Sequence, residues 1–83
     1  MAGTHRALPV LLRICALIDQ LFIVEVGPFG QQLAADARAA WLATGNKLRP
    51  ADVEQYVDLL AQHIDDQERR EEFVQDARGC IRL

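Results

Sequence analysis

Three short breaks divide this chain of 83 residues into four segments, each long enough for one helix. The breaks are Gly27-Pro28, the stretch 45–50 and Asp65-Asp66. Glycine and proline interrupt helices strongly, and within each segment the apolar residues recur at helical spacing. The sequence therefore predicts an all-α fold, a small four-helix bundle with short connections, in which the whole chain is a single helical domain.

The predicted helices cover residues 7–25, 28–44, 50–63 and 66–79. Pro28 and Pro50 suit the first turn of a helix, because the amide proton that proline lacks has no helical partner there. Gly45 favours a left-handed stop after the second helix. Asp65 has Glu68 three residues later, which is the spacing of a capping box at the start of the fourth helix.

The predicted core collects apolar residues from all four segments. It comprises Ile18, Phe22, Phe29, Leu33, Trp41, Val57, Leu60, Ile64 and Phe73. The second helix is expected to bury the stripe of Phe29, Leu33, Ala37, Ala40 and Trp41. Trp41 and Tyr56 are expected to be aromatic residues of the core or its edge, because large aromatic side chains usually bury most of their surface.

The charge of the chain argues against nucleic acid and anionic membranes as partners. The formal net charge is −3 and the isoelectric point is about 5.2, so the chain lacks the basic surface that binds phosphates. Residues 1–50 carry a balance of +2 and residues 51–83 a balance of −5. A helix-turn-helix interpretation of the last two helices fails as well, because Arg69, Arg70 and Arg78 share their helix with four acids.

The apolar run from Ala7 to Val26 is the nearest approach to a membrane or targeting segment. Charged or polar residues interrupt it at Arg13, Asp19 and Gln20, so it lacks the roughly 18 uninterrupted apolar residues that span a bilayer. We expect no membrane association and a cytoplasmic location.

Two histidines and two cysteines are the candidates for metal or nucleophile chemistry. His5, Cys15, His63 and Cys80 include no closely spaced pair of ligands, and both cysteines fall on apolar stripes. The sequence also has no glycine-rich phosphate loop. We therefore expect no catalytic residue, no metal and no cofactor, and predict that the chain is not an enzyme.

Four runs resemble a known domain. They are residues 22–33 (FIVEVGPFGQQL), 48–53 (LRPADV), 59–66 (LLAQHIDD) and 70–73 (REEF). Over about residues 17–77 the chain resembles the small helical domain of unassigned function found at the C-termini of bacterial Ser/Thr kinases and other signalling proteins. The resemblance implies no catalytic residues and an accessory or interaction role.

The first helix carries two apolar seams where one would suffice. One seam consists of Leu11, Cys15, Ile18 and Phe22. The other consists of Val10, Ile14, Leu17, Leu21 and Val24, which we call the second seam. At 100° per residue the two seams lie about 110° apart, so one neighbour cannot cover both. Either the chain's other helices sandwich this helix, or the second seam meets another copy or a partner helix.

The sequence as a whole predicts a non-enzymatic helical protein-interaction module, accessory to a bacterial signalling or assembly system. The alternative is a dedicated secretion-chaperone or antitoxin-like subunit that binds one protein partner. In either case the expected partner is a protein, or a second copy in a homodimer, bound through the second seam. Gly27 and Pro28 are expected to form a structural corner between the first two helices.

Overall fold

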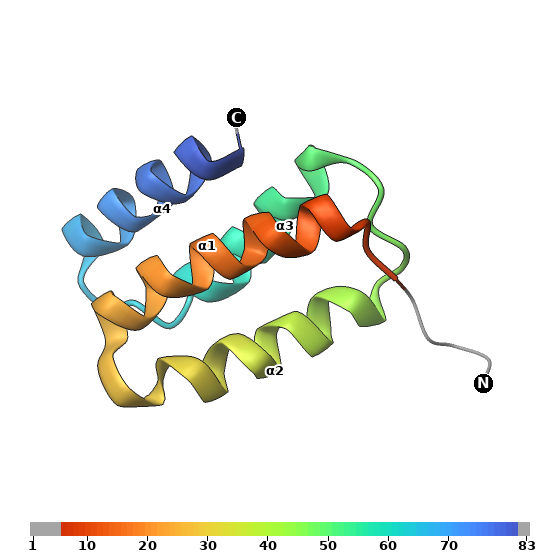
Figure 1. The fold of residues 1–83 in the computed structure, drawn as a ribbon. Coiled ribbons are helices and arrows are strands. Elements are labelled where there is room, and N and C mark those ends of the chain that lie inside the picture. Colours follow the sequence, from red (N-terminus) through yellow and green to blue (C-terminus); the bar gives the residue numbers. More distant parts are fainter. Residues whose placement is uncertain (1–5, 82–83) are drawn as a thin grey trace.

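The computed structural model describes residues 6–81. The α-helices are α1 (Pro9–Val26), α2 (Gly30–Ala43), α3 (Pro50–Ala61) and α4 (Gln67–Ile81), and a short 3-10 turn η1 (Gly27–Phe29) joins α1 to α2 (Figure 1). Among the described residues there is no strand, only an isolated bridge between Ala7 and Lys47. The predicted all-α bundle is therefore confirmed, and every predicted helix end lies within two residues of the observed one.

Helix α1 occupies the centre of the bundle and contacts the other three α-helices. In Figure 1 it lies in front, with α4 above it, α2 below it and α3 behind it. The buried residues of α1 are Leu11, Cys15, Ile18 and Phe22. These residues are the whole of the first seam, so the structure decides which of the two seams faces inward, a question that helical spacing left open.

The core contains most of the residues that the sequence predicted. Ile18, Phe22, Trp41, Val57, Leu60, Ile64 and Phe73 are all buried, as is Tyr56. Phe22 meets Phe73 of α4 edge-on with ring centroids 5.8 Å apart, and Trp41 packs against Tyr56 of α3 at 5.4 Å. Such offset aromatic pairs add to the stabilisation that burial alone provides.

The prediction for the α2 stripe was wrong at its first residue. Phe29 is 77% exposed, because it belongs to the 3-10 turn, whose different residue spacing changes the direction of the side chains. The buried residues of α2 are Gly30, Ala34, Ala37 and Trp41. Leu33, also predicted for the core, is only partly buried, and Ala40, predicted for the stripe, is exposed.

The corner between α1 and α2 depends on two glycines. Gly27 ends α1 with a φ of +82°, a backbone conformation that favours glycine. At Gly30 an added Cβ would lie 2.9 Å from the Cα of Ile23, so only glycine allows α2 to start this close to α1. The structural corner predicted at Gly27 and Pro28 lies where expected, although Pro28 belongs to η1 and not to the first turn of α2.

The start of α4 differs from the predicted capping box by one residue. The cap is Asp66 and not Asp65, since Asp66 Oδ1 accepts hydrogen bonds from the backbone N–H groups of Glu68 at 2.9 Å and Arg69 at 3.2 Å. Asp65 and Asp66 are adjacent and carry the same side chain, so the sequence alone does not show which of them caps α4. The backbone path out of α3 decides which one caps the exposed amides of α4.

Leu60→Ala tests the core directly. Leu60 is fully buried, so its truncation should lower the free energy of unfolding by about 2–5 kcal/mol. Leu48→Ala is the matched control, because Leu48 is exposed and its truncation should cost about 0.5 kcal/mol or less. Chemical denaturation measures both, and equal losses in the two variants would contradict the core described above.

Candidate functional site

The second seam of α1 lies on the surface of the bundle. Val10 is 54% exposed, Leu17 50% and Val24 82%. Ile14 and Leu21 are partly buried and pack against the edge of the core. The five residues predicted for an interface therefore form one apolar strip, of which three members are open to solvent and two connect the strip to the core.

The position of Asp19 shows why α2 leaves this strip open. Asp19 binds Arg38 of α2, so this side of α1 faces α2. At 100° per residue, the second seam lies on the opposite side of α1 from Asp19. In Figure 1 the outward side of α1 has no helix in front of it. The described part of the chain thus places three helices around α1 and still leaves an apolar side of it exposed.

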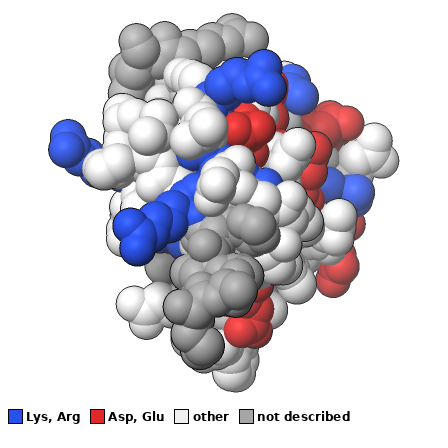
Figure 2. Space-filling view, turned by 90° about the vertical axis from the view of Figure 1, so that its right-hand side faces the viewer, with Lys and Arg blue, Asp and Glu red and all other residues white. Residues whose placement is uncertain are grey.

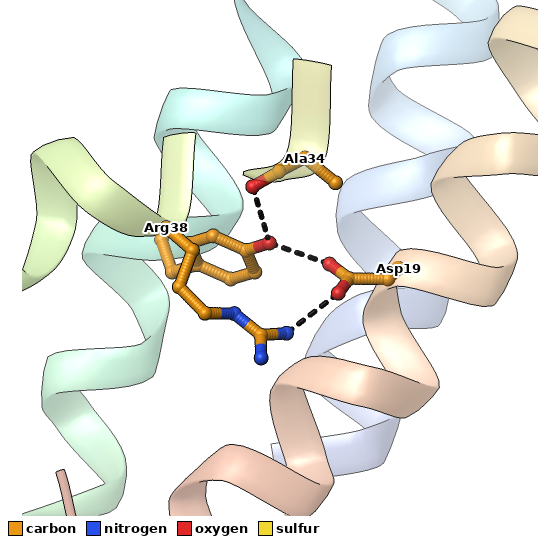
Figure 3. A network of polar contacts seen from close by, with 4 residues as sticks. Asp19, Ala34 and Arg38 are labelled. Carbon is orange, nitrogen blue, oxygen red and sulfur yellow. Dashed lines mark hydrogen bonds and ion pairs between the residues drawn. The ribbon is translucent and has the colours of Figure 1, made fainter. Parts of the chain in front are cut away.

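A polar network joins α1, α2 and α3 on the other side of α1 (Figure 3). The Arg38 guanidinium donates to Asp19 Oδ2 at 2.5 Å, and the Tyr56 hydroxyl donates to Asp19 Oδ1 at 2.5 Å. The Tyr56 hydroxyl also lies 3.3 Å from the Ala34 carbonyl oxygen. One carboxylate therefore holds side chains from two other helices.

Burial shapes the ionisation of this network. Burial, followed by the hydrogen bond to Asp19, raises the pKa of Tyr56 well above its usual range, so the hydroxyl remains a donor. Burial disfavours the charged form of Arg38, but the Asp19 carboxylate and Tyr56 together outweigh this effect, so the pKa of the guanidinium is raised. The two donors and the single acceptor satisfy one another, which is what a buried structural network requires.

The residue pattern did not predict this network. In the sequence Asp19 interrupts the apolar run, and Arg38 contributes only to the charge balance. Both residues border apolar stripes at positions where a charged side chain needs a partner, and that was the one available signal. Which residue would supply the partner depends on how three helices meet.

Replacing Asp19 by Ala should destabilise the fold more than removing an exposed carboxylate. The change leaves the partly buried guanidinium of Arg38 without its acceptor and leaves the Tyr56 hydroxyl with only the Ala34 carbonyl oxygen at 3.3 Å, so we expect a loss of about 2 kcal/mol in the free energy of unfolding. Asp58→Ala, at an exposed position of α3, is the matched control. If denaturant titrations gave the two variants the same stability, the network would have no role in holding the helices together.

The cysteines behave as small apolar residues and are not paired. Cys15 is buried, Cys80 is partly buried, and both are free. Burial raises the pKa of the Cys15 thiol to about 11. Within residues 6–81 no group of three or more His, Cys, Asp or Glu side chains gathers in a way that could hold a metal ion, and His5 lies outside the described residues. His63 is exposed and its ring meets the edge of Phe22 at 6.2 Å.

A thiol titration tests the burial of Cys15. At pH 8 the thiol is both protonated and enclosed, so a disulfide reagent should modify Cys80 in the native protein and reach Cys15 only after denaturant is added. The absorbance of the released thiolate counts the reactive groups. Two groups reacting at one rate in the native protein would show that Cys15 is not enclosed by the core.

The fold and the apolar strip on α1 define the class of this protein, which is a small all-α bundle with one exposed apolar side of a helix. None of the described helices has both the length and the apolar content needed to cross a bilayer. A family model described as a domain of unknown function (DUF8082) matches residues 14–82, and the chain belongs to this family. The match runs from within α1 to the end of the described part of α4. No curated protein and no solved structure matches the chain significantly.

Proposed function

We propose that this chain is a non-enzymatic protein-interaction module, accessory to a bacterial signalling or assembly system. The observation that carries the proposal is the solvent exposure of Val10, Leu17 and Val24 along one strip of α1. The resemblance of residues 17–77 to domains of bacterial signalling proteins supports the assignment to such a system.

An uncovered apolar strip favours association. Covering each exposed Val or Leu side chain contributes about 1 kcal/mol through the removal of apolar surface from water. Ile14 and Leu21 lie between the exposed members and are already anchored against the core, so a neighbour would meet a surface whose side chains lose little further freedom. A contiguous strip of this kind, unlike a scattered apolar residue, is typical of an interaction surface.

The order of residues along the strip suits a second copy of the chain. Leu17 is its midpoint, with Val10 seven residues before it and Val24 seven residues after it. In an antiparallel pairing of two α1 helices, each Leu17 would face the other and Val10 would face Val24. A twofold interface needs such a self-complementary surface, so we propose a homodimer formed by two α1 helices.

Leu17→Glu tests this pairing. Leu17 is half exposed, so the change should leave the folded monomer nearly as stable, within about 0.5 kcal/mol. It should nevertheless abolish the dimer, because it puts two carboxylates face to face at the centre of an apolar contact. Size exclusion with light scattering measures the mass, and circular dichroism verifies the fold.

Gln31→Glu is the matched control, since it adds the same charge at an exposed position of α2. This variant should remain a dimer. A wild-type chain that stays monomeric at high protein concentration would contradict the proposed pairing. A Leu17→Glu variant that unfolds would instead show that the strip belongs to the core.

A further inference from the structure

The segment before α1 and the loop between α2 and α3 pair as two short extended stretches. The Leu8 N–H donates to the Lys47 carbonyl at 3.1 Å, and the Lys47 N–H donates to the Arg6 carbonyl at 2.8 Å. These bonds form the parallel bridge between Ala7 and Lys47. The Arg6 N–H also donates to Asn46 Oδ1 at 2.9 Å. The two stretches therefore lie side by side where α1 and α3 begin.

Extended backbone sends successive side chains to opposite sides, and this alternation decides what the bridge exposes. Ala7 is partly buried and Lys47 is only 4% exposed, so both point toward the bundle. Their neighbours point outward: Leu8 is 41% exposed, Leu48 is 61% exposed, and Arg6 is exposed as well. The pairing thus gathers two leucines and an arginine on one surface.

The cations near this surface have no acidic partner in the described part of the fold. Arg6 and Arg49 are both exposed. Among residues 6–81, the ion pairs within 4 Å involve Arg38 and Arg78 and neither of these two arginines. The positive charge at this end of the bundle is therefore available to a ligand.

Asp52, the first acid after Arg49 in the sequence, already accepts hydrogen bonds from the backbone. Asp52 accepts hydrogen bonds from the backbone N–H groups of Leu48 at 3.1 Å and Arg49 at 3.0 Å. These bonds, that of Arg49 first, lower the pKa of the Asp52 carboxyl. The nearby charges of Arg49 and Lys47 lower this pKa further, so Asp52 is held chiefly by backbone amides at the start of α3 and also lies near Arg49.

We call the surface of Arg6, Leu8, Leu48 and Arg49 the basic end. Figure 2 looks onto this end of the molecule and shows Lys and Arg mainly over its left and upper parts, while Asp and Glu lie mainly toward the right, with some charges of each sign among the other. A surface that combines an exposed pair of leucines with nearby cations favours ligands that carry both apolar and acidic groups.

We propose that the basic end binds an acidic segment of a partner protein, one that carries leucine-sized apolar side chains among its Asp and Glu residues. Charge complementarity supplies the preference for acids, because Arg6 and Arg49 are exposed and form no ion pair within 4 Å in the described part of the chain. The exposed Leu8 and Leu48 supply the apolar contact. This surface lies apart from Leu17, the centre of the second seam, so the inference does not depend on the homodimer.

An anionic bilayer fits this surface less well than a protein segment does. The chain as a whole carries a net charge of −3, and the acids visible in Figure 2 share this end with the cations. Stable attraction to anionic lipids usually needs a cluster of several basic residues without such acids. A narrow acidic segment can contact the cations and avoid the acids beside them.

Peptide display tests the proposal with a library of random segments in place of the partner. The peptides are selected on the immobilised full chain, and the enriched ones are measured by fluorescence anisotropy. We expect enrichment of Asp and Glu together with Leu or similar residues. The double variant Arg6→Gln, Arg49→Gln should weaken binding by about fivefold, from two exposed charge pairs, and the remaining affinity should fall as salt is added.

Two further variants separate this surface from the rest of the molecule. Arg69→Gln with Arg70→Gln removes the same charge from exposed positions of α4 and should leave the affinity unchanged. Leu17→Glu should also bind the selected peptides normally, which distinguishes failure of the homodimer from failure of this inference. Thermal melts establish that each variant is folded.

Three results would overturn the inference. The first is enrichment of peptides without an excess of acids, and the second is equal affinity for the wild type and the Arg6, Arg49 variant. The third is binding to phosphatidylserine vesicles that is lost in the same variant, since that would assign the basic end to lipid.

Discussion

The whole bundle depends on the burial of one side of α1. Leu11, Cys15, Ile18 and Phe22 are fully enclosed, and the three other α-helices enclose them. Within residues 6–81, those are the α-helices that can cover the longest apolar segment of the chain. Because they surround the first seam, the second seam stays at the surface. The exposed strip is thus a geometric consequence of the way this small core closes.

Polar contacts then fix how the other helices sit around α1. The Asp19 carboxylate joins Arg38 of α2 to Tyr56 of α3, while the Trp41 indole donates to the Asp52 carbonyl at 2.8 Å. The second contact ties α2 to the first turn of α3. Apolar packing alone tolerates rotation of one helix against another, whereas these directional bonds favour one arrangement. A fixed arrangement also keeps the exposed strip and the basic end in constant positions.

Helical spacing was enough to predict those features of the fold that are determined within a single segment of the chain. The helix ends near Pro50 and Gly45, and the presence of two apolar seams on the first helix, follow from local residue types. The prediction that Phe29 is buried was wrong because a 3-10 turn precedes α2, and the spacing of the apolar residues does not indicate that turn. The partner of Asp19 and the bridge at Lys47 require segments far apart in sequence to meet. The second seam was visible in the sequence, but whether another helix covered it depended on the packing of the entire chain.

The central claim is that α1 buries one seam within the chain and offers the other to a neighbour. Methyl resonances of Leu, Val and Ile, followed by NMR as the protein is diluted, test this claim most directly. We expect the methyl shifts of Val10, Leu17 and Val24 to change with concentration, while those of Leu11 and Ile18 stay constant. Shifts of the second seam that do not change from dilute to concentrated protein would contradict the claim.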